Sequence, residues 1–598
     1  TLSLHDALPI FLFYKHTFFC MNGGVIIAKV LKEQGVKFLF TLCGGHISPI
    51  FVEAEKAGIR VIDTRHEVNA VFAADAVSRL SGVPGVAAVT AGPGLTNTIT
   101  AVKNAMLAQS PLVLLGGAAA TILKGRGSLQ DIDQMALMKP NVKWAASLKR
   151  VKDIVPTLQK AFAIAQTGVP GPVFVECPID LLYDESLVRE WYGAKSDVPP
   201  RNLKDRVIKW YVNRHVEGVF AGKNSIQFTN RQPPIQYPHH SGSQLSQLAR
   251  QLQKAQKPLL LIGSGAVMFP QKAAQLAAAV HKLGIPVYLS GMARGLLGAN
   301  SPIQFRHHRR EALRQADLII LAGVPCDFRL DYGQHLNRDA VYININRSKE
   351  DLNKNKKPDI GLLADPQECL IALAGLQPTK PDISAWLQTL VNSDAKREEN
   401  ISLRAQENLA NGINPLQLFR SMNTQLPDNA ILIADGGDFV GTAAYTLRPP
   451  KPLSWLDPGA FGTLGVGAGF ALGAKLCFPD AEVYIIWGDG SSAYSLMEYD
   501  TFVRHHLPVI SVIGNDAAWA QIARDQIDIL QSTAATNLAY SDYEMVGQAF
   551  GANGKRVATL ENFNQALTQA QQGLAQGKPF IINAIIGKSD FRKGSISM

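Results

Sequence analysis

The sequence has few of the features that identify a class of protein by composition alone. Its six cysteines in 598 residues include no C-x-x-C pair, which disfavours a disulfide framework or a zinc site and favours buried thiols in a reducing compartment. The net charge is only +10 and no long Lys/Arg block concentrates it, which argues against a dedicated nucleic-acid binder. Hydrophobic residues at 46% exclude a disordered or collagenous chain, and the length allows about four domains.

The N-terminal end does not share the pattern of the rest. The first methionine is Met21, and residues 1–20 do not join the periodic pattern that begins at Gly23. We interpret them as an artefactual or unstructured head, in which residues 11–20 are too short and too polar to span a membrane. The expected location is the cytoplasm, or an intracellular membrane if an N-terminal anchor precedes this sequence.

Apolar strand-like runs alternate with helical segments from Gly23 onward. Strands are predicted at 38–42, 59–63, 86–90, 112–116 and 173–176, at 258–263, 286–289, 318–322 and 341–344, and at 430–434, 483–487, 509–514 and 580–586. Continuous apolar strands separated by helices are typical of parallel sheets covered on both faces. The predicted fold class is therefore α/β, with three doubly wound parallel-sheet domains.

Two segments separate the predicted domains, which are 21–185, 244–380 and 412–598. The segment 186–243 is rich in Pro-Pro pairs and is predicted to be a linker, within which residues 207–220, including Trp210 and Tyr211, form a basic amphipathic helix. That helix either packs on its own protein or contacts a membrane surface, and both interpretations stay open. The charged segment 381–411 is the second predicted linker.

The most informative motif is Gly488-Asp489-Gly490-Ser491, directly after the predicted strand 483–487. Its glycines allow a tight turn that brings backbone N–H groups close to a bound anion, and Asp489 is a hard oxygen ligand. Asn515-Asp516 follows the next strand. Because open α/β sheets bind ligands at the carboxyl ends of their strands, the two loops together predict a Mg²⁺ and diphosphate site.

These two loops resemble the signature of the thiamine-diphosphate (ThDP) enzymes, and the resemblance extends over residues 23–598. Segments that share it are Arg65-His66-Glu67, residues 90–97 (TAGPGLTN), residues 171–175 (GPVFV) and residues 462–465 (GTLG). The acetolactate-synthase-like group is the most similar, and within it the 2-hydroxyacyl-CoA lyase branch, through residues 455–475, 514–521 and 590–598. The resemblance implies the ThDP-binding fold, with pyrimidine-binding, central and diphosphate-binding domains.

The resemblance also implies which residues contact the cofactor. Glu67 would hydrogen-bond the aminopyrimidine ring as the catalytic carboxylate, although taken alone it fits equally well as an acidic residue at a helix N-terminus. Leu464 would lie between the two rings of ThDP. The other implied cofactor contacts are Pro93, Asn97, Gly437, Asp438, Gly488, Gly490, Ser491 and Asn515. Asp438 departs from the family pattern, because a carboxylate beside a diphosphate is unfavourable; we expect only backbone contact there, or a helix N-cap.

The expected Mg²⁺ ligands are Asp489, Asn515, Asp516 and the backbone carbonyl of Ala518. Most members of the family have Asn-Asn where this sequence has Asn515-Asp516. By spacing Asp516 is the ligand, whereas Asn515 is the only amide of the pair. Both oxygens suit Mg²⁺, so the choice stays open.

Further candidates lie near the expected reaction site. His46 is a candidate proton donor to the substrate, Gln130 resembles a family glutamine near the reacting carbon, and Trp519 and Gln521 are candidates for the acyl pocket; taken alone, each also fits ordinary packing. The resemblance implies FAD or ADP in the central domain, at Gly291-Met292, Arg294-Gly295 and residues 327–329. No complete phosphate loop is present, so a domain without nucleotide is equally compatible.

The resemblance implies a ThDP- and Mg²⁺-dependent carbon–carbon lyase or carboligase. The expected reaction splits a 2-hydroxyacyl-CoA into an aldehyde and formyl-CoA. The alternative is acetolactate synthesis from a 2-oxo acid, pyruvate, and a second alternative is a catalytically silent binding subunit, which Glu67 and Asp489 argue against. Because these two residues lie in domains that meet across a subunit interface in the family, we expect a homodimer or homotetramer.

Overall fold

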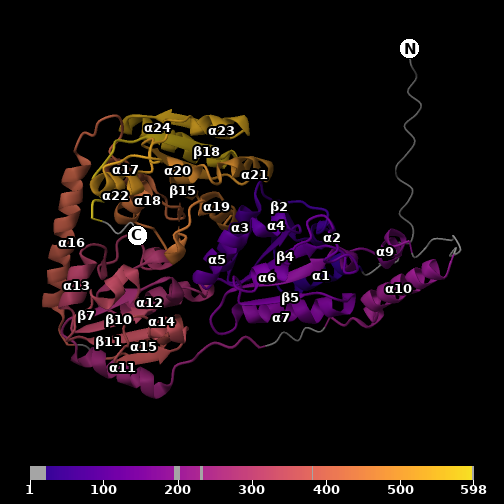
Figure 1. Ribbon diagram of the computed structural model, residues 1–598. Helices are drawn as coiled ribbons and strands as arrows, with labels where there is room; N and C mark the ends of the chain where they lie inside the picture. Colours follow the sequence, from indigo (N-terminus) through magenta and orange to yellow (C-terminus); the bar gives the residue numbers. More distant parts are fainter. Residues whose placement is uncertain (1–21, 194–201, 229–233, 380, 595–598) are drawn as a thin grey trace, which may run out of the picture.

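The computed structural model describes residues 22–193, 202–228, 234–379 and 381–594, and the predicted head, residues 1–20, lies outside them. Three sheets of six strands follow one another along the chain, each flanked by helices (Figure 1). Every strand pair is parallel. The predicted fold class of three doubly wound α/β domains is confirmed.

The first and third sheets have the same strand order. The N-terminal sheet has the order β2-β1-β3-β4-β6-β5, and its strands are β1 (Phe38–Thr41), β2 (Arg60–Asp63), β3 (Gly85–Val89), β4 (Leu112–Ala118), β5 (Trp144–Ser147) and β6 (Pro172–Pro178). The C-terminal sheet has the order β14-β13-β15-β16-β18-β17, and its strands are β13 (Ile431–Ala434), β14 (Trp455–Leu456), β15 (Val483–Gly488), β16 (Ile510–Asn515), β17 (Asn553–Val557) and β18 (Phe580–Ile585). The two domains are thus alike in topology.

The central sheet has a different order, β12-β11-β10-β7-β8-β9. Its strands are β7 (Pro258–Ile262), β8 (Val287–Leu289), β9 (Gln304–Phe305), β10 (Leu318–Ala322), β11 (Val341–Asn346) and β12 (Ile360–Leu363). The two middle strands, β7 and β10, are buried along their whole length, as expected for apolar strands covered on both faces.

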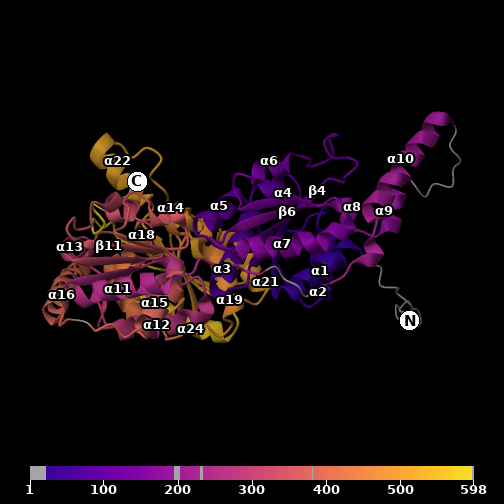
Figure 2. The ribbon, with the colours of Figure 1, turned by 90° about the horizontal axis from the view of Figure 1, so that it is seen from below.

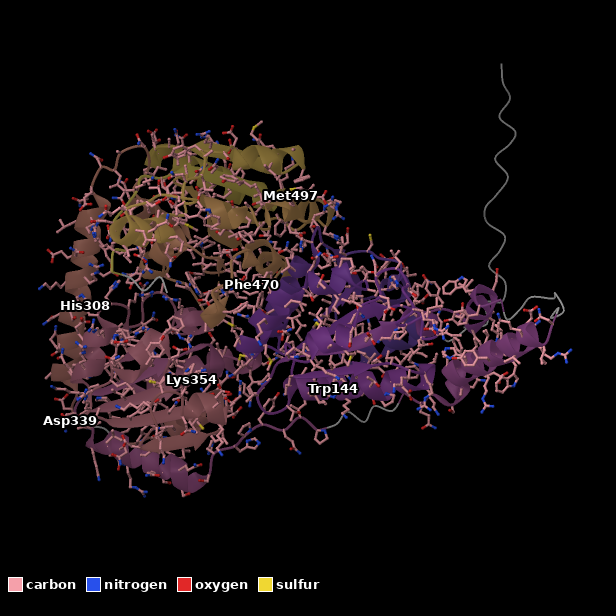
Figure 3. All side chains as sticks on the ribbon, in the orientation of Figure 1. Trp144, His308, Asp339, Lys354, Phe470 and Met497 are labelled. Atoms are coloured by element: carbon pink, nitrogen blue, oxygen red, sulfur yellow. The ribbon has the colours of Figure 1, made fainter. Side chains whose placement is uncertain are left out.

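Two helices join the N-terminal and C-terminal domains at close range. In α3 (Glu67–Ser81) and α19 (Val466–Cys477), the rings of Phe72 and Phe470 meet edge to face, 5.8 Å apart; Phe470 is labelled in Figure 3. A Cβ atom at Gly469 would lie 2.5 Å from the Cβ of Phe72, and one at Gly473 would lie 2.5 Å from the carbonyl oxygen of Ala73. Only glycine at these two positions lets the helices approach this closely.

The helix predicted at 207–220 is present and begins earlier, as α10 (Leu203–Phe220). It projects from the N-terminal domain (Figure 2), and its last turns bury Val216, Val219 and Phe220. Its first turns expose Trp210 and Val207. Contact of this face with a membrane surface stays a prediction. No helix among the described segments is long and apolar enough to cross a bilayer.

The second predicted linker folds into a 22-residue helix, α16 (Ser384–Ala405), which lies along the central and C-terminal domains (Figure 1). Near its start, Trp386 Nε1 donates to the carbonyl oxygen of Pro258 at 3.0 Å. Further along, Glu398 Oε1 accepts from Arg448 of the C-terminal domain and lies 3.1 Å from Nε2 of His307 in the central domain. The helix therefore fastens these two domains together.

The contacts of Glu398 with His307 and Arg448 predict a pH-dependent contribution to stability. The hydrogen bond to His307, aided by the charges of His307 and Arg448, lowers the Glu398 pKa from 4.5 to about 2. The folded state stabilises the ionised form of Glu398 relative to the unfolded state. This contribution to stability is therefore present above pH 4.5 and is lost as the pH falls towards 2. We expect Glu398→Gln to cost about 2–3 kcal/mol of unfolding free energy at pH 6, and progressively less by pH 3.

Urea unfolding at both pH values measures this effect. The matched control is Glu399→Gln, an exposed glutamate on the same helix, which should change stability little at either pH. A cost of Glu398→Gln that stays the same from pH 6 to pH 3 would contradict the role of the charge.

Candidate active site

Three carboxylates follow neighbouring strands of the C-terminal sheet. Asp435 follows β13, Asp489 follows the end of β15 and Asp516 follows β16, and all three are nearly inaccessible to solvent. The strand order changes direction between β13 and β15, where open α/β sheets bind ligands. A cavity of about 400 Å³ lies there, and the predicted residues in its wall are Gly437, Asp438, Leu464, Gly488, Asp489, Gly490, Ser491, Asp516, Ala518, Trp519 and Gln521.

Asp489 and Asp516 oppose each other electrostatically within this cavity. Burial raises the pKa of Asp489 to about 6 and that of Asp516 to about 7, and the charge of Asp489 adds to the shift at Asp516. Asp489 accepts backbone N–H groups of Gly490 at 2.8 Å and Ala518 at 3.2 Å. A bound cation would relieve this unfavourable pairing of buried carboxylates.

The Asn515 side chain points away from the cavity. Its Nδ2 donates to Asn583 Oδ1 at 3.1 Å and to the carbonyl oxygen of Ser541 at 3.3 Å, and its Oδ1 accepts from the N–H of Ala517. Asp516, not Asn515, is in the cavity wall. Of the two oxygens that the sequence left open as a metal ligand, the structure thus brings that of Asp516 into the site.

The Gly488–Ser491 turn has the expected form. It leads from β15 into the short helix α20 (Asp489–Ser492), and the backbone N–H of Gly488 donates to Ser491 Oγ at 3.1 Å. A Cβ atom at Gly490 would lie 2.6 Å from the ring of Trp519. A glycine is therefore required there, and Trp519 covers the turn.

The carboxylate of Asp438 has a cationic partner that the sequence did not reveal. It forms an ion pair with Arg524 of α22 (Ala520–Leu530). Asp438 is the first residue of α18 (Asp438–Thr446), and Gly437, with φ at 102°, is the N-cap in its place. The pairing reduces the repulsion that an isolated carboxylate would exert on a nearby diphosphate.

Asp435 is a further residue of this site that sequence reasoning missed. Its two carboxylate oxygens accept the backbone N–H groups of Gly465 at 2.9 Å and Gly467 at 2.7 Å. These bonds hold the loop that carries Leu464, whose side chain packs against Gly436. Burial raises the Asp435 pKa to about 7. Its position directly after the strand 430–434 was the available signal.

A second group of predicted residues gathers in the N-terminal domain around the turn at Gly92-Pro93-Gly94. Glu67 is the first residue of α3 and is buried, and its Oε2 accepts from Asn97 Nδ2 at 3.0 Å. Its Oε1 lies beside Gly94, close enough that a Cβ there would be 3.5 Å away. Glu67, Pro93 and Asn97 are therefore brought together.

His46 and Gln130 join the same group through Thr90. The Nδ1 atom of His46 lies 3.3 Å from Thr90 Oγ1, and Gln130 Oε1 accepts from this hydroxyl at 3.5 Å. Burial lowers the pKa of His46, which favours its neutral form. The structure thus places both candidates beside the turn near Glu67.

Glu498 of the C-terminal domain holds the segment before Glu67. Its fully buried carboxylate accepts the backbone N–H groups of Arg65 at 2.9 Å and His66 at 3.2 Å, and Asn69 Nδ2 at 2.9 Å. Burial raises its pKa. The start of α3 is therefore fixed by a carboxylate from another domain, a role that no sequence motif indicated.

The N-terminal group and the C-terminal cavity do not meet within one chain. The wall of the C-terminal cavity, as far as the described residues go, contains residues 435–522 only. Glu67, His46 and Gln130 are absent from it. The chain thus carries two separate halves of the predicted site.

The predicted nucleotide positions lie at a cleft between the central and C-terminal domains. Gly291, Arg294 and Arg329 line a cavity of about 290 Å³, which also reaches Gly437 and Pro458. The Asp327 carboxylate accepts from Arg329 at 2.7 and 2.9 Å. Whether FAD or ADP binds there stays a prediction.

The donor set of the C-terminal cavity fits Mg²⁺ and a diphosphate better than a metal held by protein alone. In the described segments no cluster of three or more His, Cys, Asp and Glu side chains suits a metal ion. The cavity offers the carboxylates of Asp489 and Asp516, backbone groups and small glycines, while Asp435 and Asp438 are engaged by backbone N–H groups and by Arg524. Mg²⁺ is commonly held in this way, by one or two carboxylates together with phosphate oxygens.

The C-terminal parallel sheet has this cavity at its switch point. The N-terminal domain has a sheet of the same topology and a buried glutamate. Together these features define an enzyme of the thiamine-diphosphate class. Comparison with family models supports this. The chain matches the thiamine pyrophosphate enzyme N-terminal TPP binding domain over residues 21–137, the central domain over 245–373 and the C-terminal TPP binding domain over 435–584. The chain belongs to the thiamine pyrophosphate enzymes, whose cofactor is the same ThDP.

Named relatives match nearly the whole chain. The 2-hydroxyacyl-CoA lyase 2 of Danio rerio is 49% identical over 96% of this chain and 93% of its own length. The human protein of the same name is 50% identical, over 96% and 92%. The acetolactate synthase large subunit of Mycobacterium tuberculosis is 33% identical, over 95% and 96%.

The role of Asp435 predicts a measurable defect in Asp435→Asn. An amide accepts through one oxygen only, so one of the two glycine N–H groups would lose its acceptor, at a cost of about 1–3 kcal/mol of unfolding free energy. The Leu464 loop should loosen and ThDP affinity should fall, measured by cofactor titration. Asp480→Asn, at an exposed aspartate, is the control. Unchanged cofactor affinity in Asp435→Asn would contradict the assignment.

Proposed function

We propose that this chain is a ThDP- and Mg²⁺-dependent lyase that cleaves 2-hydroxyacyl-CoA into an aldehyde and formyl-CoA. The observation that carries the proposal is the likeness to 2-hydroxyacyl-CoA lyase 2 at about 50% identity along almost the entire chain, against 33% for an acetolactate synthase. The presence of both Glu67 and Asp489 argues against a silent binding subunit.

The C-terminal cavity would hold the charged end of the cofactor. Asp489 and Asp516 would bind Mg²⁺, which cancels the repulsion between them, and the backbone of the Gly488–Ser491 turn would contact the diphosphate. Arg524 would keep the Asp438 charge neutralised beside it. Leu464, fixed through Asp435, would support the cofactor rings.

The N-terminal group would supply the proton chemistry. ThDP, when bound, provides a nucleophilic carbon and an electron sink for carbon–carbon cleavage. Glu67, held by Asn97, would hydrogen-bond the aminopyrimidine ring, while Gln130 would hydrogen-bond the substrate and His46 would move a proton at its oxygen atoms.

The deciding assay incubates ThDP/Mg²⁺-loaded protein with a 2-hydroxyacyl-CoA and, separately, with pyruvate, and identifies the products by mass spectrometry. We expect aldehyde and formyl-CoA from the first and little product from the second. Glu67→Gln should lower kcat by at least about 100-fold, since it removes a group that acts on a proton. Acetolactate as the main product would favour the alternative function, and full activity in Glu67→Gln would reject the catalytic assignment.

We also propose that the active enzyme is a homodimer or a larger homo-oligomer. Within one chain Glu67 does not reach the cavity that contains Asp489. A second copy in a symmetric pair would bring the N-terminal group of one chain to the C-terminal cavity of the other, and vice versa.

Complementation between two inactive variants tests this arrangement. Glu67→Gln and Asp489→Asn should each be inactive alone. Unfolded and refolded together, their mixed dimers contain one site with both intact residues, so about a quarter of wild-type activity should return. No recovery, while mixed dimers are detected by mass spectrometry, would place both residues of a site in one chain.

A further inference from the structure

A cavity of about 430 Å³ lies where β8 and β9 end, between the central domain and helices α16 and α18. We call it the arginine cavity, because five arginines line it: Arg294, Arg306, Arg309, Arg310 and Arg397. Three histidines, His307, His308 and His335, and a single acid, Glu311, are also in the wall. His308 reaches towards α16, where its Nδ1 lies 2.9 Å from Ser393 Oγ (Figure 3). Cationic side chains outnumber acidic ones by five to one.

Three of the five arginines of this cavity are held by backbone groups rather than by acids. Arg294 donates to the carbonyl oxygen of Ala444 at 2.9 Å, Arg306 to that of Ala299 at 3.1 Å and Arg309 to that of Arg329 at 2.8 Å. Across the described ranges, none of the three has a carboxylate oxygen within the 4.0 Å of an ion pair. Each guanidinium group carries five N–H donors, so donors remain for a ligand.

Apart from Glu311 in its wall, two acids near the cavity, Asp394 and Glu398, are already engaged elsewhere. Asp394 Oδ1 accepts the backbone N–H groups of Arg306 at 3.0 Å and His307 at 2.8 Å. Glu398 binds His307 and Arg448. Burial, with the charges of Arg448 and Arg294, lowers the Arg306 pKa to about 10. Burial also lowers the pKa of Arg294 and Arg309. The cations are therefore gathered with too little negative charge, and an anion would stabilise them.

The arginine cavity adjoins, through a neighbouring cleft, the cavity of the cofactor site. It shares Arg294 and Ala444 with the cleft between the central and C-terminal domains. That cleft in turn shares Asp435, Gly436, Gly437 and Pro458 with the cofactor cavity. An elongated ligand that spans these adjoining cavities would have its reactive end beside the cofactor and a polyanionic end among the arginines.

We propose that the arginine cavity binds the phosphate groups of the CoA part of the substrate. This inference rests on the proposed function and adds the place where the CoA nucleotide is recognised. CoA has a diphosphate and a 3′-phosphate at the end of a long arm, and arginine forks bind phosphate oxygens in pairs. Tyr445 is also in the wall, where His307 and Arg592 contact its ring.

The double variant Arg306→Gln/Arg309→Gln tests the proposal in the ThDP/Mg²⁺-loaded enzyme. Calorimetric titration should show CoA affinity reduced by about 10- to 100-fold, from the loss of charge-assisted hydrogen bonds. Steady-state assays compare the 2-hydroxyacyl-CoA with the same acyl group on pantetheine, which has no phosphate. The selectivity, which is the ratio of the two kcat/KM values, should fall by a similar factor. Arg306→Lys/Arg309→Lys should recover part of the selectivity, because it keeps the charge.

The matched control is Arg314→Gln. Arg314 is an exposed arginine of α13 (Arg309–Gln315), the helix that begins with Arg309, and it lies outside the cavity wall; the variant should bind CoA as the wild type does.

Wild-type CoA affinity and selectivity in the double variant would overturn the proposal. Binding of ADP or FAD that the double variant abolishes, with CoA affinity unchanged, would also overturn it, because the phosphates would then belong to a separate nucleotide. CoA binding that depends on the arginines, in an enzyme without lyase activity, would contradict the proposed function and support the cavity assignment.

Discussion

The close approach of α3 and α19 is the contact on which both halves of the site depend. Gly469 and Gly473 let α19 lie against Phe72 and Ala73 with almost no space between the backbones. Glu67 begins α3, and the Leu464 loop leads directly into α19. A shift of either helix would therefore move Glu67 and the Leu464 loop together. The buried residues of both domains also merge into one core around this contact.

The sequence predicted the central strands of each sheet better than the edge strands. All five strands that were not predicted, β5, β9, β12, β14 and β17, are edge strands. Two of them, β9 and β14, are only two residues long, and β17 (NGKRV) is largely polar. An edge strand pairs on one side only and needs no continuous apolar run, so the pattern that reveals a buried strand is missing. The polar segment 381–411 carried no apolar stripe strong enough to predict α16.

For the site, local motifs were sufficient only for residues that act through their own loop. The Gly488–Ser491 turn lies as its spacing predicts, and the group around Thr90–Asn97 gathers near Glu67 in keeping with the family resemblance. Asp435, Glu498 and Arg524 were not predicted, because each acts on a partner far away in the chain. The choice between Asn515 and Asp516 also depended on tertiary structure, since Asn583 engages the Asn515 amide. Spacing cannot reveal a partner that only folding brings near.

Helix α16 has a consequence for how a large substrate gains entry. With 22 residues it is about 33 Å long, and it is attached to the central domain through Trp386 and to both domains through Glu398. The walls of the cleft between these domains therefore cannot swing apart at this helix without breaking the bonds of Glu398. A long ligand would have to enter a cleft whose width changes little. Little free energy would then be spent on closing the protein around it, and the shape of the cleft itself would reject bulky competitors.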